Sequence, residues 1–435
     1  MDKPKTINDY STIVRKSKNV IFHGAPGTGK SYLAKQIAAD IVSDGTCEKY
    51  EDLTSEQKER IEFVQFHPSY DYTDFVEGLR PMVNDDGSMG FELRDGIFKS
   101  FVDRARKNWE DSHKDANELA KERSAQEEMS SFFSSIELGS TPFKIKTGKE
   151  FVITDVGERL IHVFIPNNAS SNRKTLFTSY IPRMLESGKD FEGPGEVALF
   201  FGKNRQNSSW SYYWGVYHEI CKRRVKRQHA ASTSSGTIPQ LESYVFIIDE
   251  INRGEISKIF GELFFSIDPG YRGESGAVST QYSNLHDDLS ERFYIPENVY
   301  IIGTMNDIDR SVDSFDFAMR RRFRFIELEA DSCLDALKGL DAKEYQDAID
   351  RMKSLNKAIK DTSELGRNYQ IGAAYFKKLQ ELKPNELWED YLEPLLRDYV
   401  QGMPDAEEAV EGFKAAFSSK QKKPTTGDSG ASNEN

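Results

Sequence analysis

The sequence predicts an α/β protein: a parallel β-sheet core, an inserted α+β module and a C-terminal helical lid. Three apolar runs, at residues 20–23, 244–248 and 299–305, have the length of buried strands and lead into polar residues. About 220 residues separate Lys30 from Asp249, whereas a strand–helix–strand unit needs only about 30, so a further module is expected between them. The C-terminal part of the chain shows helical periodicity.

The first strand leads into a glycine-rich loop. Residues 24–31 read Gly-Ala-Pro-Gly-Thr-Gly-Lys-Ser and fit the pattern G-x-x-x-x-G-K-[ST], with a helical run at 32–42 behind them. The glycines let backbone N–H groups line a concave nest, and the positive end of the helix faces the same point. An ordinary strand-to-helix turn is the alternative. We predict a phosphate-binding loop, and its expected nucleotide-binding residues are Gly24, Pro26, Gly27, Thr28, Gly29, Lys30 and Ser31.

The other two strands end in groups that suit phosphate chemistry. Asp249 and Glu250 end the second strand, at the sheet edge where parallel sheets bind ligands. We interpret Asp249, with Ser31, as holding Mg²⁺, and Glu250 as polarising the attacking water. Asn306 ends the third strand and could hydrogen-bond the γ-phosphate or that water, with a simple capping role as the alternative.

An arginine cluster, Arg320 to Arg322, follows at a predicted helix. A solvated basic helix end is one explanation. The other is that one or two of them, with Arg320 and Arg321 as the candidates, reach the γ-phosphate of a neighbouring subunit as an arginine finger. Adjacent helical residues point about 100° apart, so all three would not serve one phosphate.

The composition limits the class of protein. No run of about 18 apolar residues occurs and the N-terminus lacks a signal-peptide pattern, so we expect a cytoplasmic protein with no membrane partner. Three scattered cysteines predict neither disulfides nor a cysteine metal site. A net charge of −13 argues against a surface that coats nucleic acid throughout.

The expected domains follow from these motifs. They are a first half of the core at 1–110, the inserted module at 111–240, a second half at 241–328, the lid at 329–417 and a disordered tail at 418–435. Within them we predict a turn at 84–87, a solvated helix or stalk at 109–136, small-sheet strands between 143 and 165, and an amphipathic helix at 254–267.

The inserted module is locally basic. Residues 141–230 contain 15 Lys and Arg against 8 Asp and Glu. Aromatic residues lie among these charges, a combination that suits DNA, with basic groups for phosphates and aromatic rings for bases. They could equally fill the core of the module. The aromatic residues concerned are Phe200, Phe201, Trp210, Tyr212, Tyr213, Trp214 and Tyr217.

Taken together, these motifs resemble an AAA+ NTPase of the McrB type, the motor subunit of modification-dependent restriction systems. The similarity rests on residues 24–31, on Asp-Glu-Ile-Asn-Arg at 249–253, on Met-Asn-Asp-Ile-Asp-Arg-Ser at 305–311 and on the arginine cluster. Further similar segments are Phe-His-Pro-Ser-Tyr-Asp-Tyr at 66–72 and Leu-Gly-Arg-Asn-Tyr-Gln-Ile-Gly at 365–372.

The resemblance implies a homo-oligomeric ring, expected to be a hexamer, with GTP rather than ATP as substrate. It also implies DNA as a target and a separate McrC-like subunit that carries the endonuclease. It makes Asn306, Asp309 and Arg253 candidate members of the hydrolysis and subunit-communication site. The DNA-reading domain that typically precedes this motor is expected to be absent, and the insert to replace it. Ala373 and Ala374 stand where a more polar pair is expected, which weakens the case for a second sensor.

Two other functions stay open from the sequence. One is a MoxR-like AAA+ ATPase that remodels a protein client gripped by the insert. The other is a scaffold that does not hydrolyse nucleotide, which the presence of Lys30, Ser31, Asp249, Glu250 and Asn306 disfavours. The phosphate and metal motifs do not distinguish GTP from ATP.

Overall fold

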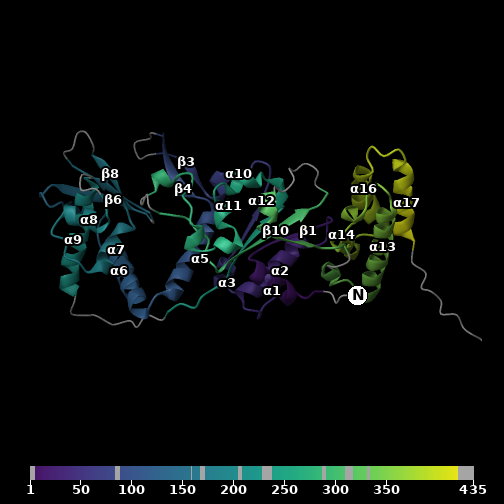
Figure 1. The fold of residues 1–435 in the computed structure, drawn as a ribbon, viewed down its shortest axis with the longest axis horizontal. Coiled ribbons are helices and arrows are strands. Elements are labelled where there is room, and N and C mark those ends of the chain that lie inside the picture. The colour runs from purple at the N-terminus through teal and green to yellow at the C-terminus, as the bar shows by residue number, and fades with distance from the viewer. Residues whose placement is uncertain are drawn as a thin grey trace, which may run out of the picture. The chain divides into compact units, whose positions relative to one another are not determined.

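The computed structural model describes residues 5–83, 89–157, 159–166, 172–203, 208–227, 238–286, 291–308, 317–330 and 334–419. They form two compact units (Figure 1). One unit combines Met1–Trp109 with Glu242–Asn435, and the other is Glu110–Leu241. No helix in the described ranges is both long enough and apolar enough to cross a membrane.

The first unit is built on a five-stranded parallel sheet, which confirms the predicted α/β fold. Its order is β11-β1-β10-β9-β2, with every neighbouring pair parallel. The strands are β1 (Asn19–Gly24), β2 (Ile61–Gln65), β9 (Tyr244–Asp249), β10 (Val299–Asn306) and β11 (Arg324–Glu327). The central strands β1, β9 and β10 are apolar almost throughout because helices and their connections bury both faces of the sheet.

Alternate side chains of each strand enter two separate cores. Val20 and Phe22 pack with α1 (Ile7–Ser17) and α2 (Lys30–Val42), next to the short α3 (Ser55–Glu59) and a 3₁₀ turn at Tyr50–Asp52. Ile21 enters the opposite core, which α4 (Tyr72–Phe75), α5 (Ile97–His113), α10 (Ile256–Phe260) and α11 (Leu263–Ser266) close. The period-two alternation therefore sets which helices cover which face.

The predicted single helix at 254–267 is wrong. The chain instead forms α10 and α11, separated at Gly261, which has a φ of 49°. A side chain there would also come within 3.1 Å of the Tyr72 ring. A residue with a left-handed backbone ends an α-helix. The helical spacing of apolar residues continues across Gly261 in the sequence, so this spacing alone did not reveal that the helix is interrupted. Three 3₁₀ turns follow, at Pro269–Tyr271, Glu274–Gly276 and Ser283–Leu285.

An antiparallel hairpin, unpredicted by the sequence, connects α4 to α5. Its strands are β3 (Glu77–Val83) and β4 (Met89–Asp95), and the predicted turn at 84–87 lies outside the described residues. Three of the four cross-strand pairs on one face of the hairpin are apolar, namely Leu79 with Leu93, Pro81 with Phe91 and Val83 with Met89, and the fourth is Glu77 with Asp95. Phe91 is 71% exposed, so the hairpin contributes little to the core of its own unit.

The lid is helical as predicted. Its helices are α13 (Ala342–Asp361), α14 (Ala373–Phe376), α15 (Pro384–Leu387), α16 (Glu393–Tyr399) and α17 (Ala406–Ser418), with 3₁₀ turns at Leu334–Leu337, Arg367–Tyr369 and Lys377–Gln380 and a π turn at Trp388–Leu392. Asp341 and Glu344 cap the start of α13 reciprocally. Residue 418 ends α17, and 420–435, most of the predicted tail, lies outside the described residues.

The inserted unit packs helices against one face of a four-stranded antiparallel sheet. Its elements are α6 (Ala116–Ser134), β5 (Pro142–Lys144), β6 (Glu150–Val156), β7 (Leu160–Phe164), β8 (Arg173–Phe177), α7 (Tyr180–Ser187), α8 (Pro194–Phe200) and α9 (Ser209–Arg227). The segment 109–136, predicted as a solvated helix or stalk, is helical, but it is not solvated throughout because α6 buries Leu119, Ala125, Met129 and Phe132. Its charged residues are the outer face of a packed helix.

The two ends of the insert leave the first unit at one place. The backbone N–H of Glu242 donates to Oδ1 of Asn108, at 2.9 Å. The buried amide of Asn298 donates to the carbonyl oxygens of Ala105 and Glu242, at 3.1 and 3.0 Å. These hydrogen bonds join α5 to the segments before β9 and β10, at the place where the chain enters and leaves the insert.

Candidate functional site

Three segments far apart in sequence meet at one edge of the parallel sheet. Gly24, at the end of β1, lies opposite Asn306, at the end of β10, and β9 flanks β10 on its other side. Ser31 Oγ donates to Asp249 Oδ1 at 2.5 Å. Asn306 Nδ2 donates to Glu250 Oε1 at 2.9 Å. The structure therefore brings the predicted loop, acidic pair and amide into direct contact.

The glycine-rich loop needs its glycines for conformation. Gly27 and Gly29 have φ values of 73° and 82°, and Gly24 has 147°, all in the region that side chains disfavour. A Cβ at Gly24 would also lie 2.4 Å from the carbonyl oxygen of Leu328. The loop thus turns sharply from β1 into α2, whose first residue is Lys30.

Lys30 lies folded over the loop and is only 7% exposed. Its Nζ donates to the carbonyl oxygens of Gly24 and Ala25, at 3.2 and 2.8 Å, and to Thr28 Oγ1 at 3.3 Å. Thr28 Oγ1 in turn donates to Ala25. These loop contacts hold the amine at the nest where phosphate oxygens would bind.

Ser31 and Asp249 fit a magnesium ion. A hydroxyl and a carboxylate are hard oxygen donors, and Mg²⁺ in phosphate-binding sites typically uses one or two such protein groups with water and substrate oxygens. Thr304 Oγ1 also donates to Asp249 Oδ1 at 2.5 Å, which holds the carboxylate toward the loop. A bound Mg²⁺ would neutralise charge on the phosphates.

Glu250 has a strained backbone. Its φ of 52° is left-handed, one of three such values among the described residues other than glycine. This conformation costs free energy, and residues that adopt it cluster at active sites and ligand-binding sites. Asn306 holds one carboxylate oxygen of Glu250, and Arg253 Nε lies 3.3 Å from the other. The carboxylate is thus aimed by two partners.

Thr304 is a site residue that the sequence reasoning missed. Besides bonding Asp249, it accepts a hydrogen bond at 3.3 Å from the backbone N–H of Glu250, so it orders both acidic residues. A signal was present: Thr304 interrupts an apolar strand two residues before Asn306, hence on the same face. Asn252 was also missed; its buried amide donates to the carbonyl oxygen of Asn306 at 3.3 Å.

The arginine cluster is divided between surface and interior. The helix α12 (Phe317–Arg320) ends at Arg320, so the expectation of three adjacent helical arginines is wrong. Arg320 and Arg321 are exposed, and neither forms a described hydrogen bond or ion pair with Asp249 or Glu250 of its own chain. Arg322 is buried and donates to the carbonyl oxygen of Ala318 at 2.7 Å. Asp309 lies outside the described residues.

The lid contacts the glycine-rich loop through its backbone. Gly372 N–H donates to Pro26 at 2.9 Å, and Ala374 N–H donates to Gly27 at 3.0 Å. A Cβ on Gly372 would lie 2.2 Å from the Gly27 backbone, and one on Gly27 would lie 2.6 Å from the Tyr375 ring. Burial raises the pKa of the Tyr375 hydroxyl. Glycine at both positions permits this close approach.

The aromatic residues of the insert fill its core. Trp210, Tyr212, Tyr213 and Tyr217 are each at most 8% exposed, and Phe200, Phe201 and Trp214 pack against the same cluster. A ring that stacks on a base must be accessible, so the stacking role considered for the four buried rings is wrong. The compact unit, residues 110–241, has 18 Lys and Arg against 16 Asp and Glu, because its first segment, 110–140, has 8 Asp and Glu against 3 Lys and Arg.

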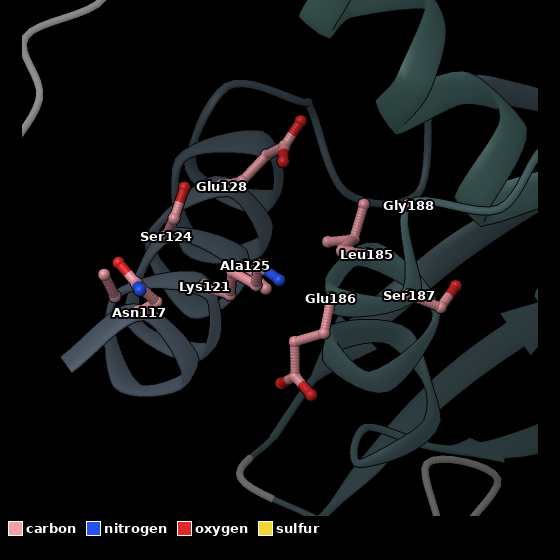
Figure 2. A pocket seen from close by; sticks show the side chains of 10 residues that line it. Asn117, Lys121, Ser124, Ala125, Glu128, Leu185, Glu186, Ser187 and Gly188 are labelled. Carbon is pink, nitrogen blue, oxygen red and sulfur yellow. The ribbon is translucent and has the colours of Figure 1, made fainter. Parts of the chain in front are cut away.

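The insert also contains a cavity of about 710 Å³ between α6 and α7 (Figure 2). Lys121, Glu128 and Glu186 line it together with small side chains. Burial, followed by the negative charge of Glu122, raises the pKa of Glu186. The cavity thus has a carboxyl group on each of the two helices, beside apolar groups that include Leu185.

The sheet order and the positions of these groups define the class of protein. A phosphate loop after β1, an acidic pair after β9, an amide at the end of the central β10 and a helical lid are the features of an AAA+ P-loop NTPase fold. Residues 211–323 match the family model for the AAA domain of the dynein-related subfamily, and residues 347–407 match the McrB alpha-helical lid domain.

Two relatives narrow the class. The chain is 24% identical over 374 residues to the Type IV methyl-directed restriction enzyme EcoKMcrB subunit of Escherichia coli K12, covering 82% of this chain and 47% of that protein. It is 34% identical over 95 residues to the Type II restriction enzyme BsuMI component YdiS of Bacillus subtilis 168, covering 20% and 28%. The chain thus spans less than half of either relative. The lid, the AAA domain and these similarities make the chain similar to AAA+ proteins of the McrB type.

Proposed function

We propose that this chain is a nucleoside-triphosphate-hydrolysing AAA+ ring motor of a restriction or anti-phage system, with GTP favoured over ATP. The observation that carries the proposal is the paired contact at the sheet edge, Ser31 with Asp249 and Asn306 with Glu250. It supplies a phosphate cradle, a metal-binding pair and an oriented carboxylate in one place. Both relatives are named as components of restriction enzymes, which supports the biological setting.

In the proposed reaction each group has one task. The loop N–H groups and Lys30 bind the phosphates, while Ser31 and Asp249 hold Mg²⁺. Glu250 accepts a hydrogen bond from the attacking water and orients it in line with the γ-phosphate. Asn306 fixes the direction of Glu250 and can donate to the same water.

The remaining charge stabilisation is proposed to come from a second copy of the chain. Arg320 and Arg321 are exposed and bond neither acidic residue of their own site, which suits arginines that act on the neighbouring subunit. A closed ring, proposed to be a hexamer, places every site between two copies. We further propose that the ring drives DNA translocation, and cleavage by a separate McrC-like nuclease subunit, in the cytoplasm.

Turnover of GTP and ATP, measured with and without the nuclease subunit and DNA, tests this proposal. We expect Mg²⁺-dependent hydrolysis, faster with GTP, that the nuclease subunit stimulates. Glu250→Gln should abolish the signal and thereby exclude a contaminating enzyme. Turnover restricted to ATP and unaffected by the nuclease subunit would contradict the restriction assignment.

The properties of the insert favour a second candidate, a MoxR-like ATPase that remodels a protein client. The almost balanced charge of the insert and its buried aromatic rings give no specific preference for DNA. Binding of the full chain to DNA at increasing salt separates the two, because affinity from phosphate contacts falls steeply with salt. The DNA motor predicts such a fall, and weakening by Lys222→Glu, a half-exposed position on α9. Absence of DNA binding at low salt would favour the protein client.

A further inference from the structure

A fully buried asparagine, Asn19, connects the start of β1 to the turn that contains Arg320, Arg321 and Arg322, called the arginine turn below. Asn19 Nδ2 donates to the carbonyl oxygens of Ile267, at 2.7 Å, and Arg322, at 3.0 Å. Asn19 Oδ1 accepts from Arg272 Nη2 at 2.6 Å. Buried polar groups are costly unless bonded, so this amide specifies a single arrangement of three segments.

Arg272 is itself buried and charged. Burial lowers the pKa of its guanidinium to about 10, which the charges of Glu297 and Asp268 partly offset. The group therefore stays protonated at neutral pH. A buried cation holds its acceptor strongly, because loss of that acceptor would leave the charge uncompensated. Arg272 thus fixes the direction in which Asn19 presents its two donor hydrogens.

Three buried residues, Met319, Arg322 and Phe323, attach the arginine turn to the rest of the first unit. Arg322 lies 3.8 Å from Asp268 and over the Phe264 ring, at 5.5 Å. Met319 and Phe323 are buried in the core. Arg320 and Arg321, between these anchors, are the two exposed arginines of the turn.

We propose that Asn19, held by Arg272, is a positioning residue that sets where Arg320 and Arg321 project toward the nucleotide of a neighbouring subunit. This rests on the proposed arginine role. The strand β1 connects to both parts of the proposed site. Gly24, at its end, begins the phosphate loop, and Asn19, at its start, holds the arginine turn. A displacement of about 1 Å at a positioned group can lower a rate about 100-fold, so loss of the Asn19 donors would affect hydrolysis in the neighbour.

Mixed assemblies test this with the full-length chain. Wild-type subunits are mixed with about a ninefold excess of a partner carrying Glu250→Gln, so that only wild-type sites hydrolyse and most receive arginines from that partner. Adding Asn19→Asp to the partner keeps the acceptor for Arg272 but removes both donors. We expect the kcat per wild-type site to fall about tenfold, with KM unchanged, as it should with Arg320→Ala and Arg321→Ala in the partner.

Asn298→Asp in the same partner is the matched control. Asn298 is also a buried asparagine that donates to two carbonyl oxygens, but it holds the ends of the insert rather than the turn. It should leave the rate per wild-type site unchanged. If the Asn19→Asp partner does not assemble, an Arg272→Lys partner is used in its place. Lysine keeps the positive charge but lacks the planar guanidinium donor, so the kcat per wild-type site should fall by the same factor.

The outcomes separate the two levels of the proposal. An undiminished rate with the Asn19 and Arg272 variants, beside a tenfold fall with the arginine variants, would overturn the role of Asn19. An undiminished rate with the arginine variants would overturn the arginine role and this inference with it. A fall with Asn298→Asp equal to that with Asn19→Asp would reduce Asn19 to a general structural role.

Discussion

The side-chain amide of Asn306 donates to the carboxylate of Glu250 at 2.9 Å, although 56 positions separate the two residues in the chain. Neighbouring parallel strands end at the same edge of the sheet, which makes this contact possible. The left-handed backbone of Glu250 turns its side chain out of the strand direction to meet the amide. The pair combines a candidate base with the group that aims it.

Glu250→Gln should stop hydrolysis while nucleotide still binds. The amide keeps the shape of the side chain but cannot accept a proton, and loss of a general base typically lowers kcat by about 100- to 10,000-fold. Steady-state turnover and the affinity for a fluorescent nucleotide check this. Glu255→Gln, on an exposed carboxylate that pairs with Lys258, is the control and should leave both unchanged. Retained hydrolysis in Glu250→Gln would assign the water to another group.

Asn306→Ala should lower kcat by about 100-fold, as loss of one positioned donor does, and leave the affinity for nucleotide close to wild type. The methyl group cannot bond Glu250, so the carboxylate loses the partner that aims it. Asn385→Ala, at an exposed position in the lid, is the control. Wild-type turnover in Asn306→Ala would reduce Asn306 to the capping role.

Gly372→Ala should weaken nucleotide binding about tenfold or more, because its Cβ would lie 2.2 Å from the Gly27 backbone and must push the lid away from the loop. Titration with labelled GTP measures this. Gly412→Ala, in α17 with no atom within 4 Å of the new Cβ, should bind normally and gain up to about 1 kcal/mol of stability. Equal affinities for the two variants would show that the lid contact does not shape the site.

Stability should fall between pH 6.5 and 9 through a buried histidine. The nearby carboxylate of Glu291, 3.6 Å from Nδ1, and a hydrogen bond with Glu77 raise the pKa of His286 to about 9. Because the folded pKa lies above the unfolded one, this stabilisation is complete below pH 6.5 and is lost as the pH rises through 9. The change should be on the order of 2 kcal/mol. Denaturant unfolding at several pH values measures it.

His286→Gln should remove most of that pH dependence and is the direct check. At the acid end, burial raises the pKa of Glu77, but hydrogen bonds from His286 and Thr280 and the charge of Lys99 outweigh it and lower the pKa to about 2. The contribution of Glu77 is therefore present above pH 4.5 and is lost only as the pH falls toward 2. An unchanged slope in His286→Gln would assign the alkaline loss to other groups.

The sequence predicted the fold and the members of the site wherever one local pattern carried the information. The loop at 24–31 and the strand ends at Asp249 and Asn306 are such patterns, and parallel topology alone brings them together. Thr304 was missed because its place in the strand indicates that it shares a face with Asn306 but not that its hydroxyl contacts both acidic residues, Asp249 and Glu250. Whether Glu250 and Asn306 perform the proposed chemistry is for the variants above to decide.

Other features depended on contacts that no local pattern contains. The helix break at Gly261 coincides with the Tyr72 ring, nearly two hundred positions earlier in the chain. The aromatic residues around Trp210 could not be assigned to surface or core from composition, because their partners Phe143, Phe151 and Tyr180 come from other elements. The β3–β4 hairpin has the alternation of a half-buried sheet, but Val83, Met89 and Phe91 on its apolar face are left exposed by the part of the chain that the structure describes.

The shared exit point of the insert has a consequence for how such proteins diversify. Asn108, Glu242 and Asn298 form the hydrogen bonds at the junction, and all three residues belong to the first unit and not to the insert. A different module could therefore replace the insert between Trp109 and Glu242 without disturbing strand pairing or the sheet edge that carries the candidate site. Selection could thus exchange the inserted module while the parallel sheet and its strand ends are inherited unchanged.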